Sequence, residues 1–274
     1  MSRTFARLIT ATVRTLVAPL SARQRQRVLA RVIAELRRDE AVTIETPRGT
    51  LKFLQARGAF AASAIARFHS DEPETLAWID GFAPGEVLWD IGANIGLYAL
   101  YAGLDPTRRV FAFEPSAFNF GVLAEHIALN RMDDRVRPLC IALGAHGGLG
   151  ELCMRHTDPG HGSNALNVAA NNFGPFEPTF RQAIPAYTID GFRATFDLPP
   201  PAHLKLDVDG IELDIVRGAE RTLPHVNSLL VEVEGATGAA GVDELTARLA
   251  AAGLVEDPAI RAQGSCRNRL YRRA

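Results

Sequence analysis

Several kinds of residue and pattern are scarce in this chain of 274 residues. It has three cysteines, Cys140, Cys153 and Cys266, too few and too scattered for a disulfide framework or a zinc finger, so we expect a reducing, cytoplasmic location. No apolar run reaches the ~20 residues that a membrane-spanning helix needs. The charge is nearly balanced, with 30 Lys+Arg against 31 Asp+Glu, which excludes a nucleic-acid binder that relies on overall basicity. Lysine is rare, since only Lys52 and Lys205 are present.

What remains is an ordinary globular composition, with 47% hydrophobic and 22% charged residues. The length fits one α/β domain of ~200–250 residues with an extension. We predict an Arg-rich helical extension at 1–40, a β-hairpin region at 41–66 and one larger domain at 67–274. Within that domain, residues 150–185 are rich in Gly, Pro, Asn and His, which indicates an irregular loop or lid.

The extension contains two predicted amphipathic helices, because its apolar residues recur at helical spacing. Those of the first helix run from Phe5 to Leu20, and those of the second from Val28 to Leu36. Many arginines accompany them, and the first acid is Glu35. Two hypotheses follow. We favour a helical pair that packs on the main domain or on a partner subunit, as in a homo-oligomer. The alternative is an interfacial helix resting on anionic lipid at the inner face of the membrane, through residues 1–38.

The rest of the chain alternates short apolar strands with helices. Two runs, 42–46 and 51–54, flank a Pro/Gly turn and predict the hairpin. From residue 86 onward the pattern predicts a mostly parallel sheet covered by helices on both faces. The predicted strands are 87–90, 110–114, 136–143, 204–207 and 229–232, with final strands from the tail. The predicted helices are 74–82, 97–104, 118–130, 211–223 and 243–252.

The strongest motif is the turn after the first of these strands. Gly92 and Gly96 would let the backbone approach a ligand, and the helix that follows would offer free N–H groups. The spacing Gly92-x-Asn94-x-Gly96 departs from the dinucleotide fingerprint G-x-G-x-x-G. Asp90 stands at the strand end, where a carboxylate would repel pyrophosphate but suit the cationic methionine part of S-adenosylmethionine.

Two further segments belong to the same predicted cofactor site. Glu114 ends the second strand at the distance expected for an acid that binds ribose hydroxyls. The alternative is a carboxylate that caps the next helix, where Ser116 and Asn119 would also fit. We include Ser116 in the predicted site. Leu143 lies in the segment 139–144, which would line the adenine because the strand ends meet at one edge.

Taken together, these motifs resemble the FkbM family of S-adenosylmethionine-dependent methyltransferases. They are D-x-G-A-N-x-G at 90–96, F-E-P at 113–115 and K-x-D-x-[DE]-G-x-E at 205–212. The resemblance covers roughly residues 68–234. It implies a Rossmann-like class I methyltransferase fold and methylation of a hydroxyl, often on a sugar, glycan, glycolipid or secondary metabolite. It also implies that the cofactor is bound by Asp90, Gly92, Asn94, Gly96 and Glu114.

Several candidate catalytic groups follow the later strands. Methyl transfer to oxygen requires a group that helps to remove the acceptor proton. Lys205, Asp207 and Asp209 follow the fourth strand, and the family usually has Glu where this chain has Asp209. One mechanism uses a divalent ion such as Mg²⁺, held by Asp207, Asp209 and Glu232. The other uses a carboxylate, His156 or His161 as general base, and His161 is the better of the two histidines because Gly160 and Gly162 flank it. Helix capping by the two aspartates and a salt bridge of Lys205 are the structural alternatives.

Two other function classes compete with an O-methyltransferase. One is a nicotinamide-dependent oxidoreductase, against which Asp90 and the 205–212 motif argue. The other is a catalytically inactive methyltransferase-like domain that docks through its amphipathic N-terminus. The intact motif residues argue against that second alternative. We expect a small-molecule or glycan acceptor and no nucleic-acid partner.

Overall fold

The computed structural model describes residues 2–38, 41–171, 174–233, 238–261 and 265–274. The chain divides into two units, 1–42 and 43–274. The first contains the two predicted helices, α1 (Ser2–Val17) and α2 (Ala22–Arg38). None of the helices in the described part of the chain is long and apolar enough to cross a bilayer.

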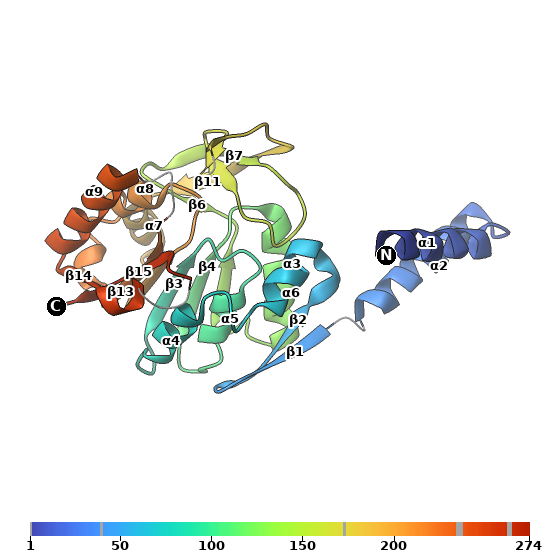
Figure 1. Cartoon of the computed structure of the whole chain (residues 1–274), viewed down its shortest axis with the longest axis horizontal. Coiled ribbons are helices and arrows are strands. Elements are labelled where there is room, and N and C mark those ends of the chain that lie inside the picture. Colours follow the sequence, from blue (N-terminus) through green and yellow to red (C-terminus); the bar gives the residue numbers. More distant parts are fainter. Residues whose placement is uncertain (1, 39–40, 172–173, 234–237, 262–264) are drawn as a thin grey trace. The chain divides into compact units, whose positions relative to one another are not determined.

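A seven-stranded sheet forms the centre of the second unit (Figure 1). Its strands, in spatial order, are β14 (Leu254–Asp257), β15 (Asn268–Arg273), β13 (Ser228–Glu232), β12 (His203–Leu206), β3 (Val87–Ile91), β4 (Arg109–Phe113) and β5 (Val136–Leu139). The five strands from β13 to β5 are parallel, and β15 runs antiparallel to both of its neighbours. In chain order these five strands follow the 3-2-1-4-5 arrangement of a Rossmann-like sheet, so the predicted fold class is confirmed.

Helices cover both faces of this sheet, as the continuous apolar strands predicted (Figure 1). They are α4 (Pro73–Asp80), α5 (Leu97–Ala102), α6 (Ala117–Asn130), α7 (Ile189–Phe196), α8 (Glu212–Arg217) and α9 (Gly238–Ala251). One core cluster joins Trp89 and Ile91 of β3 to apolar side chains of α7, α8 and α9. The predicted helix at 211–223 is shorter than expected, because Gly218 ends α8 and a 3-10 turn at Leu223–His225 follows.

The segment predicted as an irregular loop contributes three strands to a second, four-stranded sheet. Its strands, in spatial order, are β6 (Ala142–Leu143), β11 (Phe180–Tyr187), β7 (Gly148–Met154) and β8 (Asn164–Leu166). The predicted strand at 136–143 is therefore divided between two sheets. Gly and Pro obscured this pairing in the sequence, since β11 and β7 lie far apart in the chain and pair over seven positions. A short pair, β9 (Ala170–Asn171) and β10 (Gly174–Pro175), follows β8.

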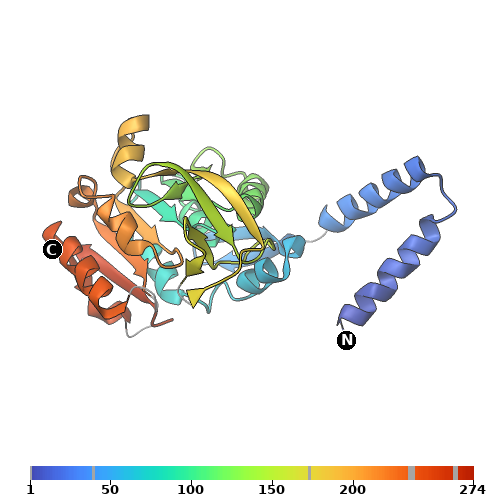
Figure 2. The same cartoon turned by 90° about the horizontal axis from the view of Figure 1, so that it is seen from above.

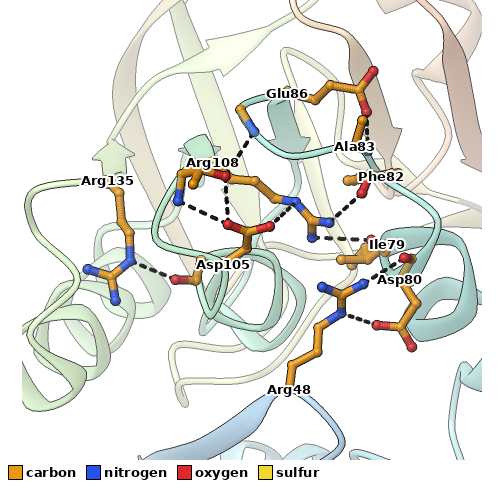
Figure 3. A network of polar contacts seen from close by, with 12 residues as sticks. Arg48, Ile79, Asp80, Phe82, Ala83, Glu86, Asp105, Arg108 and Arg135 are labelled. Carbon is orange, nitrogen blue, oxygen red and sulfur yellow. Dashed lines mark hydrogen bonds and ion pairs between the residues drawn. The ribbon is translucent and has the colours of Figure 1, made fainter.

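The predicted hairpin is present as β1 (Ala41–Thr46) and β2 (Gly49–Leu54). Residues Gln55–Arg57 form a 3-10 turn before α3 (Ala59–Ala66), and α10 (Pro258–Arg261) follows β14. Arg48, in the hairpin turn, contacts both the side chain and the carbonyl of Asp80 at the end of α4 (Figure 3). The buried Arg108 donates to the carbonyls of Ile79 and Phe82 at 3.2 and 2.7 Å. These cations lie near the C-terminal end of α4, where the helix dipole favours positive charge.

Candidate active site

A cavity of about 340 Å³ opens at the carboxyl ends of the parallel strands. It lies where the chain order of the sheet reverses, between β3 and β12, which is where open α/β sheets bind ligands. Seven of the predicted site residues line it: Gly92, Asn94, Glu114, Leu143, Asp207, Asp209 and Glu232.

The turn after β3 is held by internal hydrogen bonds. The N–H groups of Gly92 and Ala93 donate to the Phe113 carbonyl at 2.9 and 3.0 Å, and that of Asn94 donates to Glu114 at 2.8 Å. These bonds fix the backbone of the turn. The prediction of free N–H groups concerned the helix that follows, and it stays a prediction. Gly92 has φ +86°, and a Cβ there would lie 1.8 Å from the Asp207 carbonyl oxygen. Glycine is required because two backbone segments cross at this point.

Gly96 has a related packing role and precedes α5. A Cβ at Gly96 would lie 2.5 Å from Leu123 and 2.7 Å from Leu100. Its φ of +90° is a left-handed conformation that glycine adopts without cost. Gly96 thus allows α5 to pack closely against α6.

Glu114 sits at the end of β4, with its carboxylate buried in the cavity wall. It accepts the N–H groups of Asn94 and Ser116, both at 2.8 Å. Burial raises the pKa of Glu114 to about 7 despite these bonds. The buried Ser116 side chain caps α6 by accepting the Asn119 N–H. Ser116 therefore has the helix-capping role that the sequence offered as the alternative.

Asp90 and Lys205 form the buried charged layer next to the cavity. Asp90 is 1% exposed, and burial raises its pKa to about 6. Lys205 pairs with Asp90 in the strand register and contacts the Asp207 carboxylate. Burial alone would lower the pKa of Lys205, but Asp207, Glu72 and Asp90 together hold it above its usual value. The predicted salt bridge of Lys205 is present.

Asp207 and Glu232 form a carboxyl pair at the ends of β12 and β13. Burial favours protonation of both, yet Lys205 keeps the pKa of Asp207 below its usual value. Burial and the Asp207 charge raise the pKa of Glu232 to about 9. Glu232 therefore holds a proton more tightly than Asp207 does, and the two side chains hydrogen-bond to each other. Arg267 contacts Glu232 at 3.1 Å and Glu72 at 4.0 Å.

Asp209 holds a loop beside the cavity. Its carboxylate accepts the Asn164 N–H at 3.1 Å. The Gly160 N–H donates to Asn119 at 2.9 Å, and the Asn94 side chain donates to the Gly160 carbonyl at 3.3 Å. Gly160 and Gly162 line the cavity, whereas the His161 ring between them packs on Phe60, 4.4 Å between centroids. This packing leaves His161 poorly placed to take a proton from a molecule in the cavity.

The three carboxylates predicted to hold a metal are engaged elsewhere. Asp207 contacts Lys205, Asp209 accepts the Asn164 N–H, and Glu232 pairs with Arg267. Over the ranges that the structure describes, no group of three or more His, Cys, Asp or Glu side chains is placed to hold a metal ion. The donor set therefore does not fit the predicted Mg²⁺ site.

A family model described as the methyltransferase FkbM domain matches residues 90–254, more than half of the chain. The chain belongs to the FkbM methyltransferase family. Hexuronic acid methyltransferase AglP of Haloferax volcanii is 30% identical over 158 residues, which cover 58% of each protein. 31-O-demethyl-FK506 methyltransferase FkbM of Streptomyces tacrolimicus is 43% identical over 54 residues, 19% of this chain and 21% of that protein.

This FkbM-family chain thus spans about three fifths of AglP and about one fifth of the Streptomyces protein. Among solved structures, it is similar to fibrillarin of Aeropyrum pernix in complex with S-adenosyl-L-methionine. The TM-score is 0.44 and the identity 9%, over 85% of this chain and 82% of fibrillarin.

Three side chains at the cavity were missed in the sequence. Glu72 precedes α4, Arg267 precedes β15, and Asn119 lies in the first turn of α6. Glu72 and Arg267 lie outside the motifs, and no local spacing connects them to the strand ends. Asn119 was considered only as a helix-capping residue. Its position one turn after Ser116 was the available signal, since that places it at the same sheet edge.

Proposed function

We propose that this protein is an S-adenosylmethionine-dependent O-methyltransferase that acts on a hydroxyl of a sugar, glycan, glycolipid or secondary metabolite. Membership of the FkbM family supports methyl transfer. The names of two relatives support an oxygen-bearing acceptor, a hexuronic acid in one and a 31-O position in the other. The observation that carries the proposal is the Asp207 carboxylate, which faces the cavity beside Glu232 and contacts the buried Lys205.

The cavity wall fits the cofactor. Glu114 accepts two N–H groups, which leaves lone pairs on its two oxygens for ribose hydroxyls. Among the described residues, no donor reaches the buried Asn94 Oδ1 atom, so this acceptor is available to a ligand. Ile141 and Leu143 give an apolar wall suited to adenine. Asp90 would affect the cofactor through its charge without touching it, because the buried Asp90 lies behind Ile91 and Gly92, which line the cavity.

When bound, S-adenosylmethionine supplies a methyl group on a positively charged sulfur. The chain's own part is to orient the acceptor hydroxyl and to accept its proton. We assign that proton to Asp207, because Lys205 keeps this carboxylate ionised while Glu232 and Arg267 fix its position. Lys205 is a positioning residue here, because the cation is buried against Asp207 and the Tyr98 ring rather than in the cavity lining.

The balance of charges also suits a polyhydroxyl acceptor. Six carboxyl groups line the cavity, against two guanidinium groups, those of Arg67 and Arg267. Carboxylates accept hydrogen bonds from hydroxyl groups and favour the cationic cofactor. The loop that contains Gly160 and Gly162, together with Arg67, would face the acceptor.

The test is calorimetric titration with S-adenosylhomocysteine, followed by methyl-transfer assays on uronic acid glycosides and neutral glycosides. Asp207→Asn should keep the affinity for S-adenosylhomocysteine within ~3-fold and lower turnover by at least ~100-fold. Asp214→Asn, on the exposed side of α8, is the matched control and should leave both unchanged. Glu114→Gln should lower the affinity by at least ~10-fold. Full turnover by Asp207→Asn would refute its role, and binding of NAD in place of S-adenosylhomocysteine would refute the proposed function.

A further inference from the structure

The N-terminal unit is a helical hairpin that lies outside the matched methyltransferase domain. Figure 2 shows α1 and α2 as two helices joined by a short turn. Ser21 and Gln24 form a reciprocal capping box at the start of α2, with backbone-to-side-chain distances of 3.1 and 3.4 Å. Arg25 donates to the carbonyls of Ala18 and Leu20 in the turn. The turn is therefore specifically built.

Each helix has an apolar face that the other helix leaves uncovered. Seven large apolar side chains of this unit are 39–72% exposed. They are Phe5, Leu8, Ile9 and Leu16 of α1 and Val28, Ile33 and Leu36 of α2. At 100° per residue, the four on α1 fall on one side of the helix, and Arg7 and Arg14 fall on the other. A shallow surface hollow lined by Ala6, Arg7, Thr10, Ala11 and Arg14 marks that second side.

The charge of this segment is strongly one-sided. Residues 1–38 contain nine arginines and one acid, Glu35, a formal charge of +8. Because the whole chain carries −1, the remaining residues carry −9. Pairing with a second copy of the hairpin would bring two such cationic segments together, which opposes self-association. A nucleic acid would use the arginines but would leave the apolar faces in water.

An anionic lipid surface uses both features at once. Apolar side chains enter the boundary between headgroups and acyl chains, while arginines lie near the phosphates. No helix described for this chain could span the bilayer, so contact would be at the interface. We propose that α1 and α2 bind an anionic lipid surface and thereby bring the enzyme to membrane-associated acceptors. Only the recruitment of the enzyme to its acceptors rests on the proposed function, and the binding of α1 and α2 to lipid does not.

The experiment is flotation of the full-length protein with phosphatidylcholine vesicles, with and without roughly one third phosphatidylglycerol. Wild type should float with the anionic vesicles alone, and salt should weaken binding. Leu8→Asp with Leu16→Asp should lower binding by at least ~10-fold. The control is Thr10→Asp with Ala11→Asp, which adds the same charge on the arginine side of α1. This control should lose much less vesicle binding. Circular dichroism checks that both variants keep their helices.

Three results would overturn the proposal: no binding by wild type, equal binding to neutral vesicles, or equal losses in the two variants. A wild-type dimer that Leu8→Asp with Leu16→Asp dissociates, without vesicle binding, would assign the apolar faces to a second copy instead. S-adenosylhomocysteine titration of the same samples keeps the two proposals separate. Normal cofactor binding without flotation rejects the lipid surface alone, and flotation without cofactor binding rejects the methyltransferase proposal alone.

Discussion

A methyl group at position 92 would collide with the backbone of the neighbouring loop. In Gly92→Ala the new Cβ would lie 1.8 Å from the Asp207 carbonyl oxygen and 2.8 Å from its carbon. Contacts under 3.0 Å do not persist, so the two segments must separate by about 1.2 Å. Both contacted atoms belong to the backbone, and the β3 turn and the end of β12 are attached to strands of one sheet. We expect the free energy of unfolding to fall by about 3–5 kcal/mol.

Gly85→Ala is the matched control for this change. Gly85 has φ +81°, close to the +86° of Gly92, but a Cβ there would meet nothing within 4 Å. The control therefore carries the left-handed backbone cost of roughly 1–2 kcal/mol, partly offset by reduced freedom of the unfolded chain. Urea unfolding of both variants measures the difference. If Gly92→Ala loses no more stability than Gly85→Ala, the close crossing of the two loops is not a real constraint on position 92.

Two predictions concern the buried charges. The pKa of Glu114 is raised to about 7 from an ordinary 4.5, so the folded state holds this proton more tightly than the unfolded chain does. The protonated side chain therefore contributes about 3 kcal/mol to the free energy of unfolding below pH 4.5, and this contribution is lost as the pH rises to 7. Urea unfolding without cofactor should show this slope in wild type and less of it in Glu114→Gln, and parallel pH profiles would contradict the assignment. Lys205→Met should lower the free energy of unfolding by about 3–5 kcal/mol, because three neighbouring carboxylates lose their cation. The loss should be larger at pH 8 than at pH 5.5, since these carboxylates become protonated only in acid. The exposed Lys52→Met is its control, and equal stability of these two variants would show that Lys205 is not needed for neutralisation.

The parallel sheet could be predicted from the sequence because its signals are local. Each strand is a short apolar run, and the segments between strands have helical length and spacing. The turn at Gly92 was recognised for the same reason, and the structure adds a packing role, because a Cβ at this glycine would collide with the Asp207 carbonyl. Glu114, at the end of β4, lies in the cavity wall as its spacing suggested.

The second sheet and part of the site could not be predicted, because they depend on contacts between distant segments. β7 and β11 satisfy each other's backbone groups, and neither has a strong apolar alternation of its own. Arg267 reaches Glu232 because β15 runs antiparallel to β13, a pairing that no local pattern encodes. His161 looked suitable between two glycines, yet its ring packs on Phe60.

The scarcity of lysine gives the buried Lys205 a practical use. Both lysines lie in the described part of the chain, and Lys52 is exposed while Lys205 is 1% exposed. An amine-directed reagent should therefore modify Lys52 and the N-terminal amine of the native protein and leave Lys205 unmodified. The rate at which Lys205 is labelled would then report how often the strand ends open, and mass spectrometry of the digested peptides would measure that rate. The rate with and without S-adenosylhomocysteine would measure how far the cofactor closes that region.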